Sequence, residues 1–182
     1  PDGPVEDSLS IKWDNDFWIT TYKKDSVLYY TIMDTTKKNP ESTEKIYLYT
    51  YDCKKKKSTQ VFSTTWLGTG VYVAAWVTGV IWQNIYLHGY IGDSIGGARG
   101  SNFVFNRNKK TFSRLDFSYL TGYSLLPKDE WGKPWLACGA YKPFDKNTGV
   151  LQCDTYQNGE FFDYGGTYYK IDFENKIIKL AQ

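Results

Sequence analysis

A short stretch near the middle of the chain holds the residue types of a nucleophilic site. The segment Gly92–Gly97 reads Gly-Asp-Ser-Ile-Gly-Gly, and the chain's single histidine, His88, stands six residues before Ser94. A serine acts as a nucleophile only with a general base within hydrogen-bond reach. His88 ends a strand-like run, where we expect a partly buried structural side chain. We therefore interpret Gly92–Gly97 as a flexible loop between two strands.

Carboxylates offer a second route to catalysis. A glycan-cleaving enzyme needs two carboxyl groups about 5 to 10 Å apart, one of them with a raised pKa. The candidate carboxyl groups are those of Asp93, Asp129, Glu130, Asp154 and Asp163. Nothing in the sequence pairs any two of them. A small carboxylate-based hydrolase therefore stays an alternative, and we expect binding rather than catalysis.

Metal and cofactor sites are not indicated. Asp145–Gly149 resembles the opening of a calcium loop, but Gly149 stands where that loop needs Asp or Asn, and Tyr156 stands where it needs Glu. No His or Cys residues cluster at the spacing of metal ligands. The sequence predicts a hairpin turn at Asp145–Gly149, no metal site and no cofactor.

Two of the three cysteines flank that turn. Cys138 and Cys153 lie symmetrically about it, so a symmetric hairpin would set them directly opposite each other. We expect a disulfide there if the compartment is oxidising, and two buried thiols otherwise. A slip of one residue would send the two side chains to opposite faces. Cys53 is left over, at the start of a lysine run.

Aromatic side chains in a polar connector form the candidate binding site. The segment Trp131-Gly-Lys-Pro-Trp135 combines two large rings with Gly and Pro, where a ring is hard to bury between sheets. Exposed rings on restricted loops suit sugar faces and protein surfaces. With Tyr141, these two tryptophans are the predicted ligand-binding residues. The alternative is that both rings plug the bottom of a barrel.

The longest feature of the chain is an uncharged stretch. Residues 58–92 contain no Asp, Glu, Lys or Arg. The abundance of Val, Ile, Tyr and Trp favours two central strands with a turn at Thr78–Gly79, and we expect Trp76 and Trp82 to lie inside. The interrupting polar residues argue against a membrane span. The alternatives are a membrane-active hairpin and a contact between copies of the chain through Val71–Leu87.

The apolar runs are short, rich in β-branched and aromatic residues, and group into three sets of four. The predicted strands are Phe17–Tyr22, Val27–Met33, Lys45–Tyr51, Thr59–Ser63, Val71–Val77, Val80–Leu87, Asn102–Asn106, Thr111–Ser118, Pro134–Tyr141, Val150–Tyr156, Thr167–Phe173 and Lys176–Leu180. The last hairpin of each set repeats one pattern: alternating aromatics, then Asp or Asn, then Lys. The prediction is an all-β fold of about twelve antiparallel strands in three four-stranded units.

Three arrangements fit such units. Serial four-stranded sheets are typical of a propeller, although closed propellers have about four to eight. In strand count and length the chain resembles the β-trefoil, and a sandwich is also possible. We expect residues 1–10 to be a flexible lead-in and residues 11–182 to form a single domain.

Charge and composition limit the classes of partner that we expect. The 182 residues carry a formal net charge of +2, which gives no reason to expect nucleic acid or an anionic membrane. The run Lys54–Lys57 is predicted to be a solvated hairpin tip. The abundance of Tyr, Trp, Thr, Ser and Asn favours a secreted or cell-envelope location. The predicted function is a non-enzymatic binding module for a glycan or a protein surface, with a hydrolase or a self-assembling surface protein as alternatives.

Overall fold

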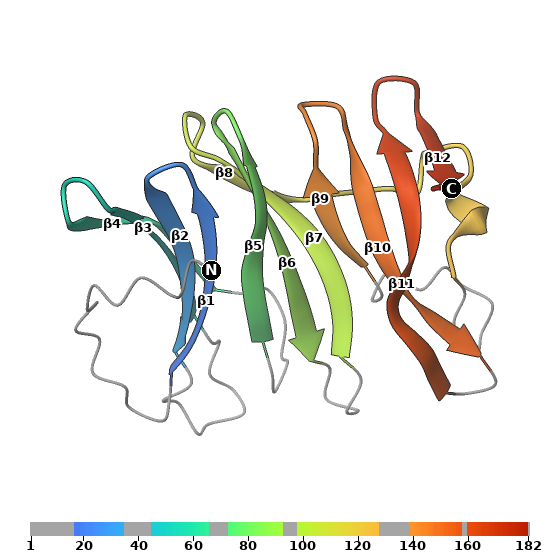
Figure 1. Ribbon diagram of the computed structural model, residues 1–182, viewed down its shortest axis with the longest axis horizontal. Coiled ribbons are helices and arrows are strands. Elements are labelled where there is room, and N and C mark those ends of the chain that lie inside the picture. The colour runs from blue at the N-terminus through green and yellow to red at the C-terminus, as the bar shows by residue number, and fades with distance from the viewer. Residues whose placement is uncertain are drawn as a thin grey trace.

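The computed structural model is an all-β protein with twelve strands in three antiparallel four-stranded sheets (Figure 1). The structure describes residues 17–34, 45–65, 73–92, 98–127, 139–157 and 160–181. Within these ranges the only helical segment is the single 3₁₀ turn η1 (Tyr123–Leu125), and no helix is long and apolar enough to cross a membrane. The all-β prediction and its three four-stranded units are confirmed.

Each sheet is a meander, in which every strand pairs with the next strand in the chain. Sheet 1 contains β1 (Phe17–Lys24), β2 (Val27–Asp34), β3 (Lys45–Asp52) and β4 (Lys57–Thr65). Sheet 2 contains β5 (Val73–Ile81), β6 (Asn84–Gly92), β7 (Ala98–Asn106) and β8 (Thr111–Arg114). Sheet 3 contains β9 (Gly139–Pro143), β10 (Thr148–Gln157), β11 (Glu160–Asp172) and β12 (Ile177–Leu180).

The sheets repeat one turn between their third and fourth strands. The residue that ends the third strand accepts hydrogen bonds from backbone N–H groups two or three residues ahead, and it is Asp52, Asn106 or Asp172. Four residues later comes a lysine with a positive φ, namely Lys56 at 49°, Lys110 at 56° and Lys176 at 55°. The side-chain cap and the left-handed residue reverse the chain over four residues. The sequence pattern at the end of each set of strands corresponds to this turn.

The uncharged stretch forms the hairpin of β5 and β6, but its turn is not where the sequence predicted it. The chain reverses at Trp82 and Gln83, between the paired residues Ile81 and Asn84. Gly79 lies inside β5 next to a register shift, and a Cβ there would come within 2.5 Å of Pro143 Cγ. The glycine therefore marks a close approach of β5 to β9 rather than a turn.

This shift of the turn overturns one prediction. Trp82, expected in the core, sits on the turn with a φ of 56° and is 84% exposed. Trp76 is half-buried on β5, and its ring meets the ring of His88 edge-on at 4.8 Å. The prediction is thus wrong for Trp82, because alternation along a strand stops where the strand ends.

Two apolar cores join the three sheets face to face. The first lies between sheets 1 and 2, where Leu48 is fully buried and the Phe62 ring stacks on Phe105 at 4.4 Å. The second lies between sheets 2 and 3 and includes Tyr86 and Leu151. Because β5 packs against β1 and β2, and β9 against β5, β6 and β7, the sheets stack in series. The strands so described form no closed barrel, and each apolar core lies between two sheets that are neighbours in this series.

A buried amide links sheet 2 to sheet 3. Asn102 on β7 donates from Nδ2 to the carbonyl oxygen of Gly139 at 2.8 Å and accepts the Tyr141 N–H at its Oδ1 at 2.8 Å. The same Oδ1 lies 3.1 Å from Nδ1 of His88, which is 1% exposed. Because Oδ1 is an acceptor, this contact assigns the ring proton to Nδ1. Asn102 thus joins β7 of sheet 2 to β9 of sheet 3, since both of its backbone partners lie on β9.

Candidate functional site

The predicted binding residues divide into two groups. Trp131 and Trp135 lie outside the described residues, so their placement stays a prediction. Tyr141 lies in the second core and is 1% exposed, with no hydrogen-bond partner for its hydroxyl in the part of the chain that is described. Burial raises the pKa of this hydroxyl far above its ordinary value. The structure therefore places Tyr141 in the core and not on a binding surface.

Of the two cysteines in the predicted disulfide, the structure describes only Cys153. Cys153 on β10 is buried and pairs across the ladder with Gly139 on β9, whereas Cys138 lies outside the described residues. The register of β9 and β10 is thus one residue away from the symmetric hairpin that would oppose the two cysteines. A Cβ on Gly139 would come within 2.6 Å of the Gln152 carbonyl oxygen. The disulfide stays a prediction, and Cys53 is half-buried beside the β3–β4 turn.

The residues considered for catalysis give no assembled site in the part of the chain that is described. Asp93, Ser94, Asp129 and Glu130 lie outside it, and Asp154 and Asp163 are placed only by their backbone. Within the described residues, no three His, Cys, Asp or Glu side chains group closely enough to hold a metal ion. The hydrolase alternative stays untested.

Asp145, considered as a calcium ligand, serves the β9–β10 turn instead. Its Oδ1 accepts the backbone N–H groups of Asn147 and Thr148, each at 2.8 Å, and its Oδ2 accepts the Thr148 hydroxyl at 2.7 Å. The Thr148 hydroxyl and these N–H groups hold the pKa of the carboxyl below its ordinary value. The hydrogen bonds show a hairpin turn, as predicted.

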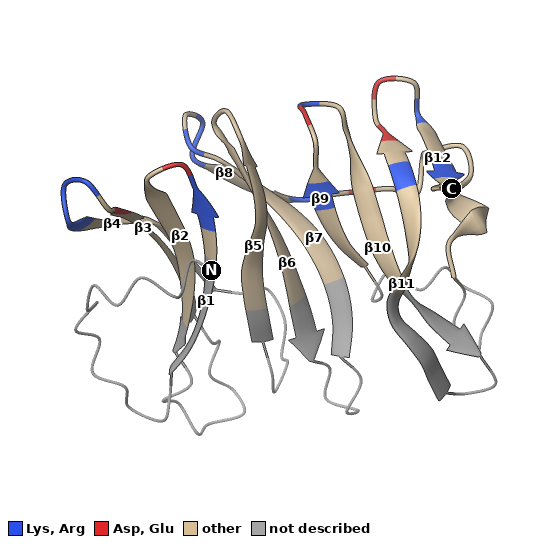
Figure 2. Ribbon diagram, viewed as in Figure 1, with Lys and Arg blue, Asp and Glu red and all other residues tan. Residues whose placement is uncertain are grey.

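Charged side chains gather at one edge of the stack. This edge, here called the turn edge, is formed by the turns β1–β2, β3–β4, β5–β6, β7–β8, β9–β10 and β11–β12, and Figure 2 shows most of the coloured segments along it. Two of its turns are strongly basic. Asp52–Lys57 carries four Lys and one Asp, and Asn106–Lys110 carries one Arg and two Lys. With seven cationic side chains and one carboxylate, the two turns carry a net charge of +6, against +2 for the whole chain, so the remaining residues carry a net charge of −4.

The two basic turns enclose a groove between sheets 1 and 2. It has a volume of about 370 Å³ and is lined by Val27, Tyr29, Thr50, Asp52, Lys55, Lys57, Thr59 and Arg107. Sheet 1 supplies every residue of the wall except Arg107, which comes from the β7–β8 turn. The stacking of Phe62 on Phe105 holds β4 and β7 together beneath this opening. Three cations, two threonines and one carboxylate thus share one concave surface.

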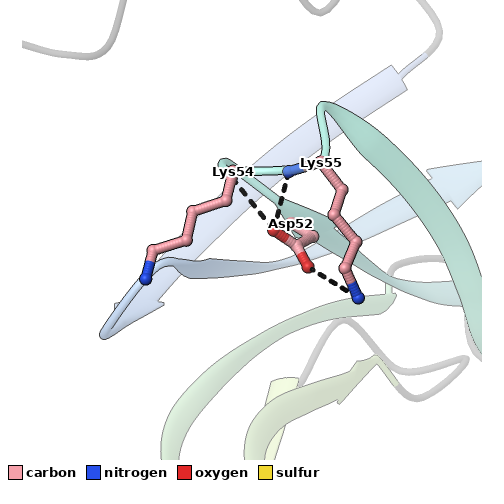
Figure 3. A network of polar contacts seen from close by, with 3 residues as sticks. All are labelled: Asp52, Lys54 and Lys55. Atoms are coloured by element: carbon pink, nitrogen blue, oxygen red, sulfur yellow. Dashed lines mark hydrogen bonds and ion pairs between the residues drawn. The ribbon is translucent and has the colours of Figure 1, made fainter.

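The carboxylate of the groove is already engaged (Figure 3). Oδ1 of Asp52 accepts the backbone N–H groups of Lys54 and Lys55 at 3.0 Å each, and Oδ2 lies 3.7 Å from the Lys55 ammonium. These backbone hydrogen bonds, with the nearby ammonium, hold the pKa of Asp52 below its ordinary value. Asp52 is therefore ionised at neutral pH and shapes the turn that carries Lys55.

The turn that carries Trp82 is hydrogen-bonded to Arg107, one of the residues that line the groove. Nη2 of Arg107 donates to the Trp82 carbonyl oxygen at 2.7 Å, and the Arg107 N–H donates to the Gln83 carbonyl oxygen at 2.8 Å. Both bonds come from Arg107, and they tie the β5–β6 turn, which carries the exposed Trp82 ring, to the β7–β8 turn. A large exposed ring thus stands on a turn that is hydrogen-bonded to Arg107, a residue of the groove wall.

A second hollow of about 370 Å³ lies on sheet 3, lined by Phe144, Thr148, Gly149, Lys170, Ile171, Asp172, Ile177 and Lys179. It pairs two lysines with one aspartate, and its exposed ring is Phe144 on the β9–β10 turn. Because it draws on a single sheet and lies away from the basic turns, it lacks the charge concentration of the first groove. We therefore take the groove between sheets 1 and 2, with Trp82, as the candidate site.

The stretch proposed as a contact between copies lies mostly inside the chain. Its buried side chains face the two cores from the middle sheet: Ala75, Val77, Val80, Ile85, Tyr86 and Leu87. On sheet 1 a separate aromatic cluster forms, in which the buried Tyr30 and the half-buried Tyr49 stack at 5.3 Å and Tyr47 tilts against Tyr49. The homo-oligomer stays a prediction.

Sequence reasoning missed this site for two reasons. It treated Lys54–Lys57 as an isolated solvated tip, and it placed Trp82 in the core. The signal was present in the repeat, because Asp52 and Asn106 occupy equivalent positions of adjacent sheets and so bring their basic turns side by side. No known protein family matches the chain, and no curated protein is significantly similar to it.

Proposed function

We propose that the protein is a non-enzymatic binding module that recognises a glycan at the turn edge, with Trp82 as the main contact residue. The observation that carries the proposal is the exposure of this ring, 84%, on a turn whose backbone accepts hydrogen bonds from Arg107. An indole ring offers a flat apolar face and one N–H donor, which together suit the apolar face and hydroxyl groups of a sugar.

Rigidity supports the choice of this ring over other exposed aromatics. Binding costs less when the contacting groups are already ordered, because little conformational entropy is lost. The turn that carries Trp82 accepts two hydrogen bonds from Arg107, one at the Trp82 carbonyl and one at the Gln83 carbonyl, and the groove beside it supplies hydroxyl and charged groups. Tyr168 is 42% exposed on β11, and it does not belong to the turn that Arg107 joins to the groove between sheets 1 and 2.

A glycan partner also fits the proposed location. Glycans are displayed outside cells and in cell envelopes, and the high content of Tyr, Trp, Thr, Ser and Asn led to the same expectation from the sequence. We therefore propose a secreted or envelope-associated protein. A protein surface is the alternative partner, because exposed tryptophans are also common hot spots of protein interfaces.

The test compares Trp82→Ala with Tyr168→Ala on a surface carrying neutral and acidic oligosaccharides. We expect the unaltered protein to retain a subset of these sugars and Trp82→Ala to weaken their binding by about 2 kcal/mol, roughly thirtyfold. Tyr168→Ala serves as the matched control and should bind normally. Both variants should unfold at the same denaturant concentration as the parent, because neither ring is buried.

Three results would contradict the proposal. One is a parent protein that retains no sugar on this surface. Another is equal weakening by Trp82→Ala and Tyr168→Ala, which would move the contact away from the turn edge. The third is release of shortened sugars during incubation, which would favour the carboxylate hydrolase instead.

A further inference from the structure

We infer that the groove between sheets 1 and 2 binds the anionic group of an acidic glycan, a sulfate or a carboxylate, through Lys55, Lys57 and Arg107. This inference rests on the proposed function and adds the chemical class of the ligand. The three cations come from two sheets and line one groove of about 370 Å³, which has room for a charged substituent together with part of a sugar ring.

The charge distribution of the chain supports an anionic ligand. The two basic turns carry a net charge of +6, whereas the rest of the chain carries a net charge of −4. The positive potential is therefore concentrated at the site and is not a property of the whole surface. Like charges gathered on adjacent turns repel each other. A bound anion relieves that repulsion, whereas a neutral sugar leaves it in place.

The arrangement of donors fits a planar or tetrahedral oxyanion. Arg107 has five N–H donors, of which Nη2 holds the Trp82 carbonyl, and a guanidinium pairs with carboxylate or sulfate oxygens in a fork geometry. Lys55 and Lys57 supply mobile point charges from the opposite wall. The one acidic side chain of the groove, Asp52, is occupied by two backbone N–H groups and by Lys55.

The remaining lining favours a sugar over a nucleic-acid strand. The hydroxyl side chains Thr50 and Thr59 line the groove and match the hydroxyl groups of a sugar. A single-stranded nucleic acid needs several aromatic rings on which successive bases stack. Among the described residues of the two basic turns and the turn they adjoin, Trp82 is the one large exposed ring. The anion is therefore assigned to a glycan, and nucleic acid is an outcome of the test.

The test uses three probes: dextran sulfate, uncharged dextran of the same length, and a single-stranded oligonucleotide of the same charge. We expect dextran sulfate to bind at least about tenfold more tightly than the other two at physiological salt. Lys55→Gln combined with Lys57→Gln should weaken dextran sulfate binding about tenfold or more, and should lower the salt-dependence slope by about two, one for each removed cation.

Two further variants separate the groove from general electrostatics. Lys54→Gln combined with Lys109→Gln removes the same charge from exposed lysines of the same turns that do not line the groove. We expect this control to weaken binding by less than about threefold, because Lys54 and Lys109 do not line the groove and act on its ligand only from a distance, where salt screens them. Asp52→Asn keeps the oxygen that accepts the backbone N–H groups but removes the negative charge, so it should tighten binding of dextran sulfate.

Each contrary result has a distinct meaning. Dextran bound as tightly as dextran sulfate would overturn the anionic class, and weakening of dextran by Trp82→Ala would then leave the proposed function standing. Absence of dextran sulfate binding would likewise overturn the inference. Equal loss in the two double-lysine variants would remove the groove as the site. Tighter binding of the oligonucleotide than of dextran sulfate would overturn both the inference and the proposed function.

Discussion

Replacing Asn102 with Leu should detach sheet 3 from sheet 2. Leu has a similar size, so the change removes hydrogen bonds with little change of volume. Two buried backbone groups lose a partner, the Tyr141 N–H and the Gly139 carbonyl, each of which is bonded to Asn102 at 2.8 Å. An unsatisfied buried group costs about 1 to 3 kcal/mol, so we expect the free energy of unfolding to fall by about 4 kcal/mol.

The assay is urea unfolding, with Asn106→Leu as the matched control. Asn106 carries the same amide on the same strand, but it caps the β7–β8 turn near solvent, at 3.1 Å from the Asn108 N–H and 2.8 Å from the Lys109 N–H. Water replaces those bonds, so the control should cost about 1 kcal/mol. Equal losses for the two variants would refute the role given to the buried amide.

Three further outcomes test the packing and the turns. Phe105→Ala removes a ring that is 3% exposed and stacked on Phe62, and it should lower the free energy of unfolding by about 3 to 5 kcal/mol in urea unfolding, whereas a loss below about 1 kcal/mol would contradict the first core. Lys176→Gly relieves a left-handed residue at φ 55° and should raise stability by about 0.5 to 1 kcal/mol, and a decrease would contradict this account of the turn. Hydrogen bonds from the Asn175 side chain and from backbone N–H groups lower the pKa of Asp172 from 3.8, so the ionised carboxylate stabilises the fold above that value and the stabilisation is lost as pH falls through the lower folded pKa. Between about pH 4 and pH 2 the melting temperature of the parent should therefore fall more steeply than that of Asp172→Asn. Parallel melting curves for the two proteins would refute this linkage.

The sequence was sufficient to predict the strands and their grouping. Short runs of aromatic and β-branched residues, separated by turn residues, predicted all twelve strands because the period of two along a sheet is a local property. The same locality explains the error at the central hairpin. Gly79 has the composition of a turn residue, but it is required by the side chain of Pro143 on another sheet, and only packing reveals that contact.

The candidate site was beyond local sequence reasoning. Lys55 and Arg107 are more than fifty positions apart, and they meet because β3–β4 and β7–β8 turns occupy equivalent places in stacked sheets. The net charge of the whole chain, +2, also conceals the positive charge of these two turns. The observed turn at Trp82 and Gln83 lies four residues after the predicted turn at Thr78–Gly79, and composition alone could not place it there, so the exposure of Trp82 was missed.

The most direct measurement of the binding surface is a titration of ¹⁵N-labelled protein with dextran sulfate, followed residue by residue through the backbone amide signals. The account predicts the largest shifts at residues 53–57, 82–83 and 107–110, together with the indole N–H of Trp82. Small shifts are expected on the outer face of sheet 3. Shifts concentrated instead at Trp131 and Trp135, with residues 53–57 and 107–110 unmoved, would contradict the assignment of the turn edge as the binding surface.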